Sequence, residues 1–183
     1  MRRYGPFLLV VACVVTGAVF VFRHLSSQVP VRPTSHRQAF PKTARPEVYL
    51  YFSGGDESHL SAERRSMVLP ERVVDRAKAI VTALIEGPTG PLTRTLPAET
   101  ELLALYVDEN GVGYVDFNKA VRDNHPGGSL TELLSIYSVV NSLCLNMPEI
   151  QAVKILIEGR DAQTLAGHID IRYPLRADLL LVK

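Results

Sequence analysis

The sequence has no tryptophan, only two cysteines, and no acidic residue among its first 46 positions. Carbohydrate sites commonly stack sugars on aromatic rings, so a sugar site here would lack its most effective residue. The cysteines, Cys13 and Cys144, lie in an N-terminal apolar run and in an apolar helix-like segment, so they are not expected to pair within one chain. A soluble domain of about 137 residues needs no disulfide to fold.

The charges divide the chain into two unlike parts. Residues 1–46 hold seven Lys and Arg and no acid, whereas residues 47–183 hold 13 basic and 19 acidic residues, a net charge of −6. Nucleic-acid binding depends on neutralising phosphates with a basic surface. An acidic domain without a basic stripe therefore argues against a nucleic-acid partner.

Residues 7–22 are apolar apart from Thr16 and Gly17. A bilayer core needs about 20 apolar residues, so this run predicts a short single-pass span, an uncleaved signal anchor over residues 1–24. Three alternatives fit less well: a cleaved signal peptide, a lipobox-like sequence at residues 10–13, and a twin-arginine signal at Arg2 and Arg3.

The positive charges beside the predicted span are Arg2 and Arg3 before it and three arginines after it, which slightly favours a cytoplasmic domain. We nevertheless expect the domain outside the cytoplasm, periplasmic or on the cell surface, because a short tail with two arginines is a usual start for a signal anchor. Residues 25–46 carry prolines at 30, 33, 41 and 46 and few apolar residues, which predicts a semi-extended linker before a folded domain at 47–183.

The folded part begins with strand patterns. Residues 48–53 alternate apolar and polar, and residues 65–69 suggest a second strand. A helix is expected from Pro70 until Gly87. Residues 103–107 and 113–117 predict a hairpin with a three-residue loop and Gly111 left-handed, which sets Leu105 opposite Val115 and Leu103 opposite Phe117.

A long helix is expected over residues 130–145, followed by a strand at 153–157. Residues 133–148 carry no charge, so this helix must be covered on most of its surface. Ser129 and Glu132 have the spacing of a capping box at its start. The order β-β-α-β-β-α-β predicts an α+β fold, a two-layer sandwich of one largely antiparallel sheet with two helices on one face.

Five segments together resemble the GerM (Germane) domain family of sporulation and spore-germination proteins, over roughly residues 48–174. They are residues 84–88 (LIEGP), 114–117 (YVDF), 127–134 (GGSLTELL), 139–143 (VVNSL) and 164–170 (TLAGHID). The resemblance implies an extracytoplasmic, membrane-tethered domain without established catalysis. It also implies association with protein assemblies of the envelope and, as a second ligand, peptidoglycan.

Two loops hold candidate site residues. Gly127, Gly128 and Ser129 could receive an anion at the helix start, although a structural cap explains them as well. His168 and Asp170 could form a catalytic pair in an envelope hydrolase, against the simpler interpretation of a histidine that holds its loop. The five histidines are scattered without the spacing of a helical metal site, so neither a metal nor a cofactor is expected.

A row of small polar residues follows one side of the predicted central helix. It consists of Thr131, Ser135, Ser138 and Ser142, with Asn141 beside it. Small residues allow close packing, here against the first helix. Uncharged surface also suits the centre of an interface with a partner or a second copy.

Tyr49 and Tyr51 share one face of the first strand and could form a small aromatic platform for peptidoglycan. The sequence as a whole predicts a non-enzymatic, membrane-anchored envelope module that contacts a protein partner. The alternative is a cell-envelope hydrolase that uses His168 and Asp170. The sequence fixes neither the partner nor the oligomeric state.

Overall fold

The computed structural model describes residues 46–183. The predicted anchor at 1–24 and nearly all of the predicted linker at 25–46 lie outside these residues. Within the described part, no helix combines the length and apolar character that crossing a membrane requires.

The chain begins with an antiparallel hairpin of β1 (Glu47–Ser53) and β2 (Leu60–Ser66). β1 was predicted correctly, and its residues Val48, Leu50 and Phe52 are buried. The prediction for the second strand was wrong by several residues, because Leu60 rather than Leu69 occupies its buried end and pairs with Ser53.

Helix α2 (Val73–Glu86) ends at Gly87 as predicted, with φ of 92° at that glycine. Strands β3 (Leu102–Val107) and β4 (Val112–Phe117) then form the predicted hairpin. Gly111 is left-handed, and the Asp108 N–H donates to the Val112 carbonyl at 3.0 Å, so the three-residue loop is confirmed.

The register of this hairpin matches the prediction at Leu105 and Val115 but not at its far end. A bulge between Leu102 and Ala104 sets Leu102, not Leu103, opposite Phe117. A bulge inserts one residue and turns its side chain to the other face. Leu103 is therefore 49% exposed instead of buried.

The second half of the domain contains a short helix, the long helix and a parallel strand. α3 (Ala120–Asp123) precedes α4 (Ser129–Cys144), which is followed by β5 (Ala152–Ile157), β6 (Arg160–Asp161) and a final 3₁₀ turn η1 (Leu179–Leu181). β5 runs parallel to β4, with Val115 opposite Ile155. The segment 163–171 is an irregular return, as predicted.

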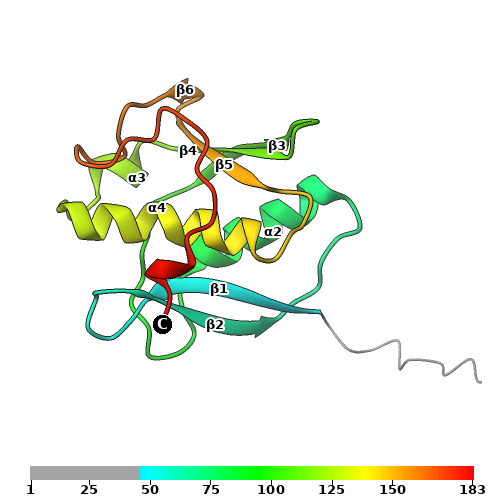
Figure 1. The fold of residues 1–183 in the computed structure, drawn as a ribbon, viewed down its shortest axis with the longest axis horizontal. Coiled ribbons are helices and arrows are strands. Elements are labelled where there is room, and N and C mark those ends of the chain that lie inside the picture. Colours follow the sequence, from blue (N-terminus) through cyan, green and yellow to red (C-terminus); the bar gives the residue numbers. More distant parts are fainter. Residues whose placement is uncertain (1–45) are drawn as a thin grey trace, which may run out of the picture. The chain divides into compact units, whose positions relative to one another are not determined.

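The α+β class and the order of the main elements are confirmed, but the single sheet is not. The strands form two sheets, β1–β2 and β3–β4–β5–β6. The two long helices α2 and α4 lie between them (Figure 1), and both contact both sheets. One core of buried residues from all these layers joins them. This arrangement explains why α4 carries so little charge, since a helix between two sheets has almost no solvated side.

Candidate functional site

The start of α4 does not form the predicted capping box. Gly128 is the N-cap residue, and both Gly127 and Gly128 have positive φ, at 84° and 87°. These two glycines turn the chain into the helix, a conformation that other residues rarely adopt. Ser129 is already the first helical residue and makes no cap hydrogen bond. These glycines turn the chain, and the Gly127 N–H, which an anion would need, is already bonded to His125 Nδ1.

Glu132 has a different role from the one predicted. Its side chain is fully buried, and its carboxylate accepts backbone N–H bonds from Ala166 at 2.8 Å, His168 at 2.8 Å and Ile169 at 3.2 Å. Burial by itself raises the pKa of Glu132, but these hydrogen bonds outweigh it and hold the pKa below its usual value. Glu132 is thus an ionised anchor for the return segment 163–171.

The predicted pair of His168 and Asp170 does not form. His168 places its Nδ1 atom 3.0 Å from Oε2 of Glu132, which fixes the histidine to α4. The Asp170 carboxylate instead pairs with Arg172, whose side-chain and backbone hydrogen bonds lower the pKa of Asp170 to about 2. His168 therefore lacks the carboxylate partner that the hydrolase hypothesis assigned to it.

A second histidine, which the sequence analysis did not single out, contacts the polar row of α4. His125 Nδ1 accepts a hydrogen bond from the Gly127 N–H at 3.0 Å, so in the neutral ring the proton is on Nε2. That atom lies 3.0 Å from Ser135 Oγ, and the Ser135 hydroxyl donates to the Thr95 carbonyl at 2.5 Å. Burial lowers the pKa of His125, which keeps the ring neutral.

This arrangement cannot activate Ser135 as a nucleophile. A serine nucleophile needs a histidine that accepts its proton. Here the histidine donates to the serine, and the serine proton is held by a backbone carbonyl. The contact is a structural one in the interior of the domain.

The remaining polar residues of the row also form hydrogen bonds within the domain. Ser135, Ser138, Asn141 and Ser142 are fully buried, so they are not the exposed contact face that the sequence suggested. Their partner is also different from the predicted first helix. They bind backbone and side-chain groups of β1, of Thr95 and of the C-terminal segment. Thr131 alone of the row is exposed.

The edge of β1 shows what the row does. Ser142 accepts the Tyr51 N–H at 3.0 Å, while Asn146 accepts the Tyr49 N–H at 2.9 Å and donates to the Tyr49 carbonyl at 2.7 Å. Ser53 exchanges two backbone bonds with Thr93. Three outward-facing residues of β1, Tyr49, Tyr51 and Ser53, are thereby bonded along the free edge. Ser142 of α4, Asn146 just after it and Thr93 together take the place of a neighbouring strand.

The predicted platform of Tyr49 and Tyr51 is not present as a pair. Tyr49 is 45% exposed, but Tyr51 is buried against Leu60 and Leu134. The stacked pair lies elsewhere, on the outer side of the second sheet: the rings of Tyr106 and Tyr114 are 4.4 Å apart and nearly parallel, at 4°. The predicted hairpin loop already implied this pairing, since Asp108 opposite Val112 sets Tyr106 opposite Tyr114.

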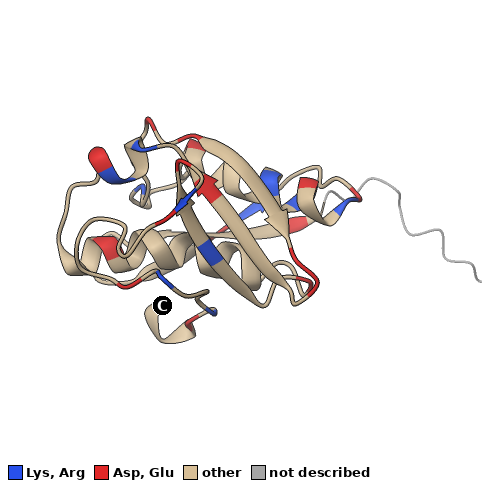
Figure 2. Cartoon of the chain, turned by 90° about the horizontal axis from the view of Figure 1, so that it is seen from above, with Lys and Arg blue, Asp and Glu red and all other residues tan. Residues whose placement is uncertain are grey.

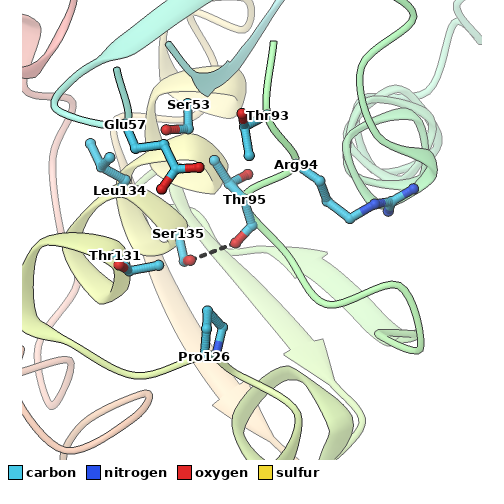
Figure 3. Close-up of a pocket in the computed structure, with 9 residues that line it drawn as sticks. All are labelled: Ser53, Glu57, Thr93, Arg94, Thr95, Pro126, Thr131, Leu134 and Ser135. Carbon is cyan, nitrogen blue, oxygen red and sulfur yellow. Dashed lines mark hydrogen bonds between the residues drawn. The ribbon is translucent and has the colours of Figure 1, made fainter. Parts of the chain in front are cut away.

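A cavity of about 250 Å³ lies in front of the polar row, at the start of α4. We name it the hydroxyl pocket, because five of its nine lining residues carry hydroxyls. Its lining residues are Ser53, Glu57, Thr93, Arg94, Thr95, Pro126, Thr131, Leu134 and Ser135. Figure 3 shows these side chains around it, with the Arg94 side chain directed away towards another helix. Sequence patterns could not find this cavity, because its walls come from four separate segments.

Residues 46–183 were compared with what a metal site and a reactive thiol require. Within that range, no three His, Cys, Asp or Glu side chains gather closely enough to hold a metal ion. Burial raises the pKa of the Cys144 thiol to about 11, so the thiolate needed for nucleophilic chemistry is scarce at neutral pH.

A family model described as Germane, sporulation and spore germination, matches residues 49–163, which is more than half of the chain. The chain belongs to the Germane family. The resemblance inferred from the sequence is thereby confirmed, although the match ends before residue 174. A comparison with curated proteins found no match to this Germane chain.

Two solved structures share the fold of this Germane domain. A putative lipoprotein from Clostridium perfringens aligns with a TM-score of 0.53 and 22% identity, over 72% of this chain and 87% of that one. The first GerMN domain of the sporulation protein GerM from Bacillus subtilis aligns with a TM-score of 0.54 and 18% identity, over 72% of this chain and 97% of that one. At these identities the likeness concerns the fold alone.

Proposed function

We propose that this Germane chain is a non-enzymatic, membrane-tethered interaction module of the cell envelope that binds a protein partner along the edge of β3. The observation that carries the proposal is an uncharged and unpaired strand edge. β3 reads LLALYV, and among residues 46–183 no strand pairs with its outer side. Natural sheet edges are usually protected by charges, prolines or a covering segment.

The backbone of this edge is available for pairing. Because the Asp108 N–H bonds to Val112 in β4, the alternating Tyr106 and Ala104 also turn their backbone groups towards β4. Leu105 and Val107 then direct theirs outward. An extended segment of a partner can add to such an edge through main-chain hydrogen bonds, while neighbouring side chains give specificity. Leu103 and Tyr106, 49% and 51% exposed, flank it.

The hydrogen bonds of the ionisable residues favour binding over catalysis. The Glu132 carboxylate is fully hydrogen-bonded by the return segment, and His168 is fixed to it. In the His125–Ser135 contact the histidine donates to the serine, which is the reverse of what nucleophilic attack requires. The hydrolase alternative loses its residue pair, because Asp170 belongs to Arg172. We therefore do not retain it.

A membrane tether and an extracytoplasmic location are supported by the sequence and by one structural neighbour. The apolar run at residues 7–22 has the length of a short membrane span. The solved neighbour from Clostridium perfringens is described as a putative lipoprotein, a class of protein held at a membrane. Both support a domain held at a membrane, and we propose that it lies on the extracytoplasmic side.

Photo-crosslinking in cells tests the β3 edge. A photoreactive phenylalanine analogue is placed at Tyr106 in the full-length chain, and in a separate strain at Tyr49, which is matched in residue type and has 45% exposure against 51%. We expect a discrete crosslinked protein from position 106 and none from position 49. Equal capture from both positions, or capture from position 49 alone, would contradict the proposal.

Peptidoglycan is a second candidate ligand, and one observation favours it. The stacked pair of Tyr106 and Tyr114 presents an aromatic surface of the kind on which sugar rings pack. Co-sedimentation of the full-length chain with purified sacculi distinguishes the two ligands. Pelleting that Tyr106→Ala abolishes and Tyr49→Ala leaves intact would favour the glycan over the protein partner.

A further inference from the structure

The hydroxyl pocket lies in a different part of the domain from the β3 edge and holds a buried polar group without a partner. Ser53 is 5% exposed, and its hydroxyl has no hydrogen-bond partner among the described residues. Buried hydroxyls are nearly always paired, because an unpaired one is destabilising. Ser53 lines the pocket, so the missing partner can come from a bound molecule.

A carboxylate without an internal partner stands beside it. Glu57 lies in the turn between β1 and β2 with a φ of 54°, a conformation that non-glycine residues seldom adopt. In Figure 3 its carboxylate points towards the space between Ser53, Leu134 and Thr95. Within residues 46–183, Glu57 forms no ion pair closer than 4 Å.

The one basic residue of the pocket wall does not neutralise this carboxylate. The Arg94 guanidinium donates to the carbonyls of Ile85 and Glu86 at the end of α2, the latter at 2.6 Å. The Thr95 hydroxyl already donates to Ser138, and the Ser135 hydroxyl already donates to the Thr95 carbonyl. The free groups of the pocket are thus one negative charge and hydroxyl oxygens that can accept hydrogen bonds.

We infer that the hydroxyl pocket binds a primary ammonium group at the end of an alkyl chain, such as the side chain of a lysine in a protein segment. An ammonium offers three donors and no acceptor, which complements a carboxylate and hydroxyl oxygens on separate walls. A guanidinium instead fits a single carboxylate through its planar fork. Leu134 and Pro126 supply apolar walls for the methylene groups. An ammonium with its own carboxylate attached would bind more weakly, because Glu57 repels that carboxylate.

The inference is independent of the β3 edge, and its test uses small probes. The full-length chain in detergent is titrated with Nα-acetyl-lysine methylamide, and binding is followed by calorimetry and by amide chemical shifts. The norleucine analogue lacks the ammonium, the arginine analogue carries a guanidinium, and meso-diaminopimelate carries an ammonium beside a carboxylate. We expect the lysine probe to bind and to shift the amides of Ser53, Glu57 and Thr131, with the three other probes at least severalfold weaker.

Two variants and one control decide the site. Glu57→Gln should weaken binding by roughly tenfold or more, because charge-assisted hydrogen bonds are the strong ones. Ser53→Ala should weaken binding while the melting temperature stays the same or rises, since the hydroxyl has no internal partner to lose. Glu109→Gln removes a carboxylate from the exposed hairpin loop and should change nothing. Tyr106→Lys should bind the probe normally, so this site is tested separately from the partner edge.

Several results would overturn the inference. They are the absence of saturable binding by the lysine probe, equal binding of the norleucine analogue, tighter binding of the arginine analogue or of diaminopimelate, and undiminished binding by Glu57→Gln. A clear fall in melting temperature with Ser53→Ala would show that the hydroxyl has a structural partner and would remove the central observation.

Discussion

The outer edge of β3 and the stretch of β1 from Tyr49 to Ser53 both carry no charged side chain, but their backbone groups are bonded differently. Ser142 of α4 and Asn146 just after its end cover the edge of β1 by bonding to Tyr51 and Tyr49. No strand or side chain within residues 46–183 covers the outer edge of β3 in this way. The difference separates an edge that is bonded within the domain from one that stays open, where we propose that a partner binds.

The edge of β2 provides a third case. Leu60 pairs with Val182 near the C-terminus, and the rest of the strand carries Glu63, Arg64 and Arg65. Charged residues discourage a second chain from adding to a strand. β3 has neither protection along Leu105–Val107, and none of its residues carries a charge in Figure 2. Only the bulge at Leu102–Ala104 shortens its usable edge.

Removal of the buried Glu132 carboxylate of α4 should lower the stability of the domain more than any other change proposed here. Glu132→Ala leaves three backbone N–H groups of the return segment without their acceptor. We expect the free energy of unfolding to fall by about 3 kcal/mol or more, with a melting temperature lower by roughly 10 °C. Calorimetry measures both quantities. A change of only one or two degrees would show that Glu132 does not hold the return segment.

The covered edge of β1 should be weakened by Ser142→Ala, which leaves the buried Tyr51 N–H unpaired. The expected loss is about 1–2 kcal/mol in urea unfolding. Ser129→Ala is the matched control, because Ser129 is an exposed serine of the same helix without a cap hydrogen bond; it should stay within about 0.5 kcal/mol of the wild type. If both variants lose the same amount, α4 does not replace a strand at this edge.

The stability of the domain should also fall gradually as the pH is lowered. His125 has a folded pKa below its usual 6.5, so the unfolded chain takes up that proton first and stability declines as the pH drops below about 6.5. The folded pKa of Glu132 lies below its usual 4.5, so its contribution is present above that value and is lost on further acidification. Unfolding curves measured from pH 8 to pH 3 should show both declines. His125→Gln should remove the first decline and keep the second, and persistence of the first would contradict its assignment.

The open edge of β3 should show the smallest effect on stability. Tyr106→Lys removes the stacked ring and adds a charge to the edge. Because the residue is half exposed, the free energy of unfolding should fall by less than about 1 kcal/mol, while capture of the partner from a crosslinker at position 103 is lost. A large loss of stability would mean that the tyrosine pair supports the fold and not an interface.

The sequence predicted the elements well wherever a periodic pattern or a glycine defined them. The central helix, the end of α2 at Gly87 and the loop at Gly111 all follow from such signals. The second strand was misplaced because Leu60 is followed by polar and charged residues that resemble a loop. The two-sheet arrangement was missed because local patterns do not say which strands become neighbours.

The polar row of α4 was recognised as unusual, but its role was not predictable. A serine that satisfies a strand edge and a serine on a contact face look the same in one sequence. Glu132 was assigned to a cap because its spacing from Ser129 fits one, whereas its partners lie more than thirty residues further along the chain. The pair of His168 and Asp170 does not form, because His168 bonds to the distant Glu132 and Asp170 bonds to Arg172, two residues further along.

The sequence alone determined the Germane family membership, the α+β class, the positions of the main helices and strands and the acidic character of the domain. These properties depend on periodicity, composition and short motifs, which are local. Only the tertiary structure decided which polar groups are buried, which strand edge stays open and where the hydroxyl pocket forms. Such features arise where segments distant in the sequence meet, and hydrogen bonding between those segments selects one partner among several that local chemistry would allow.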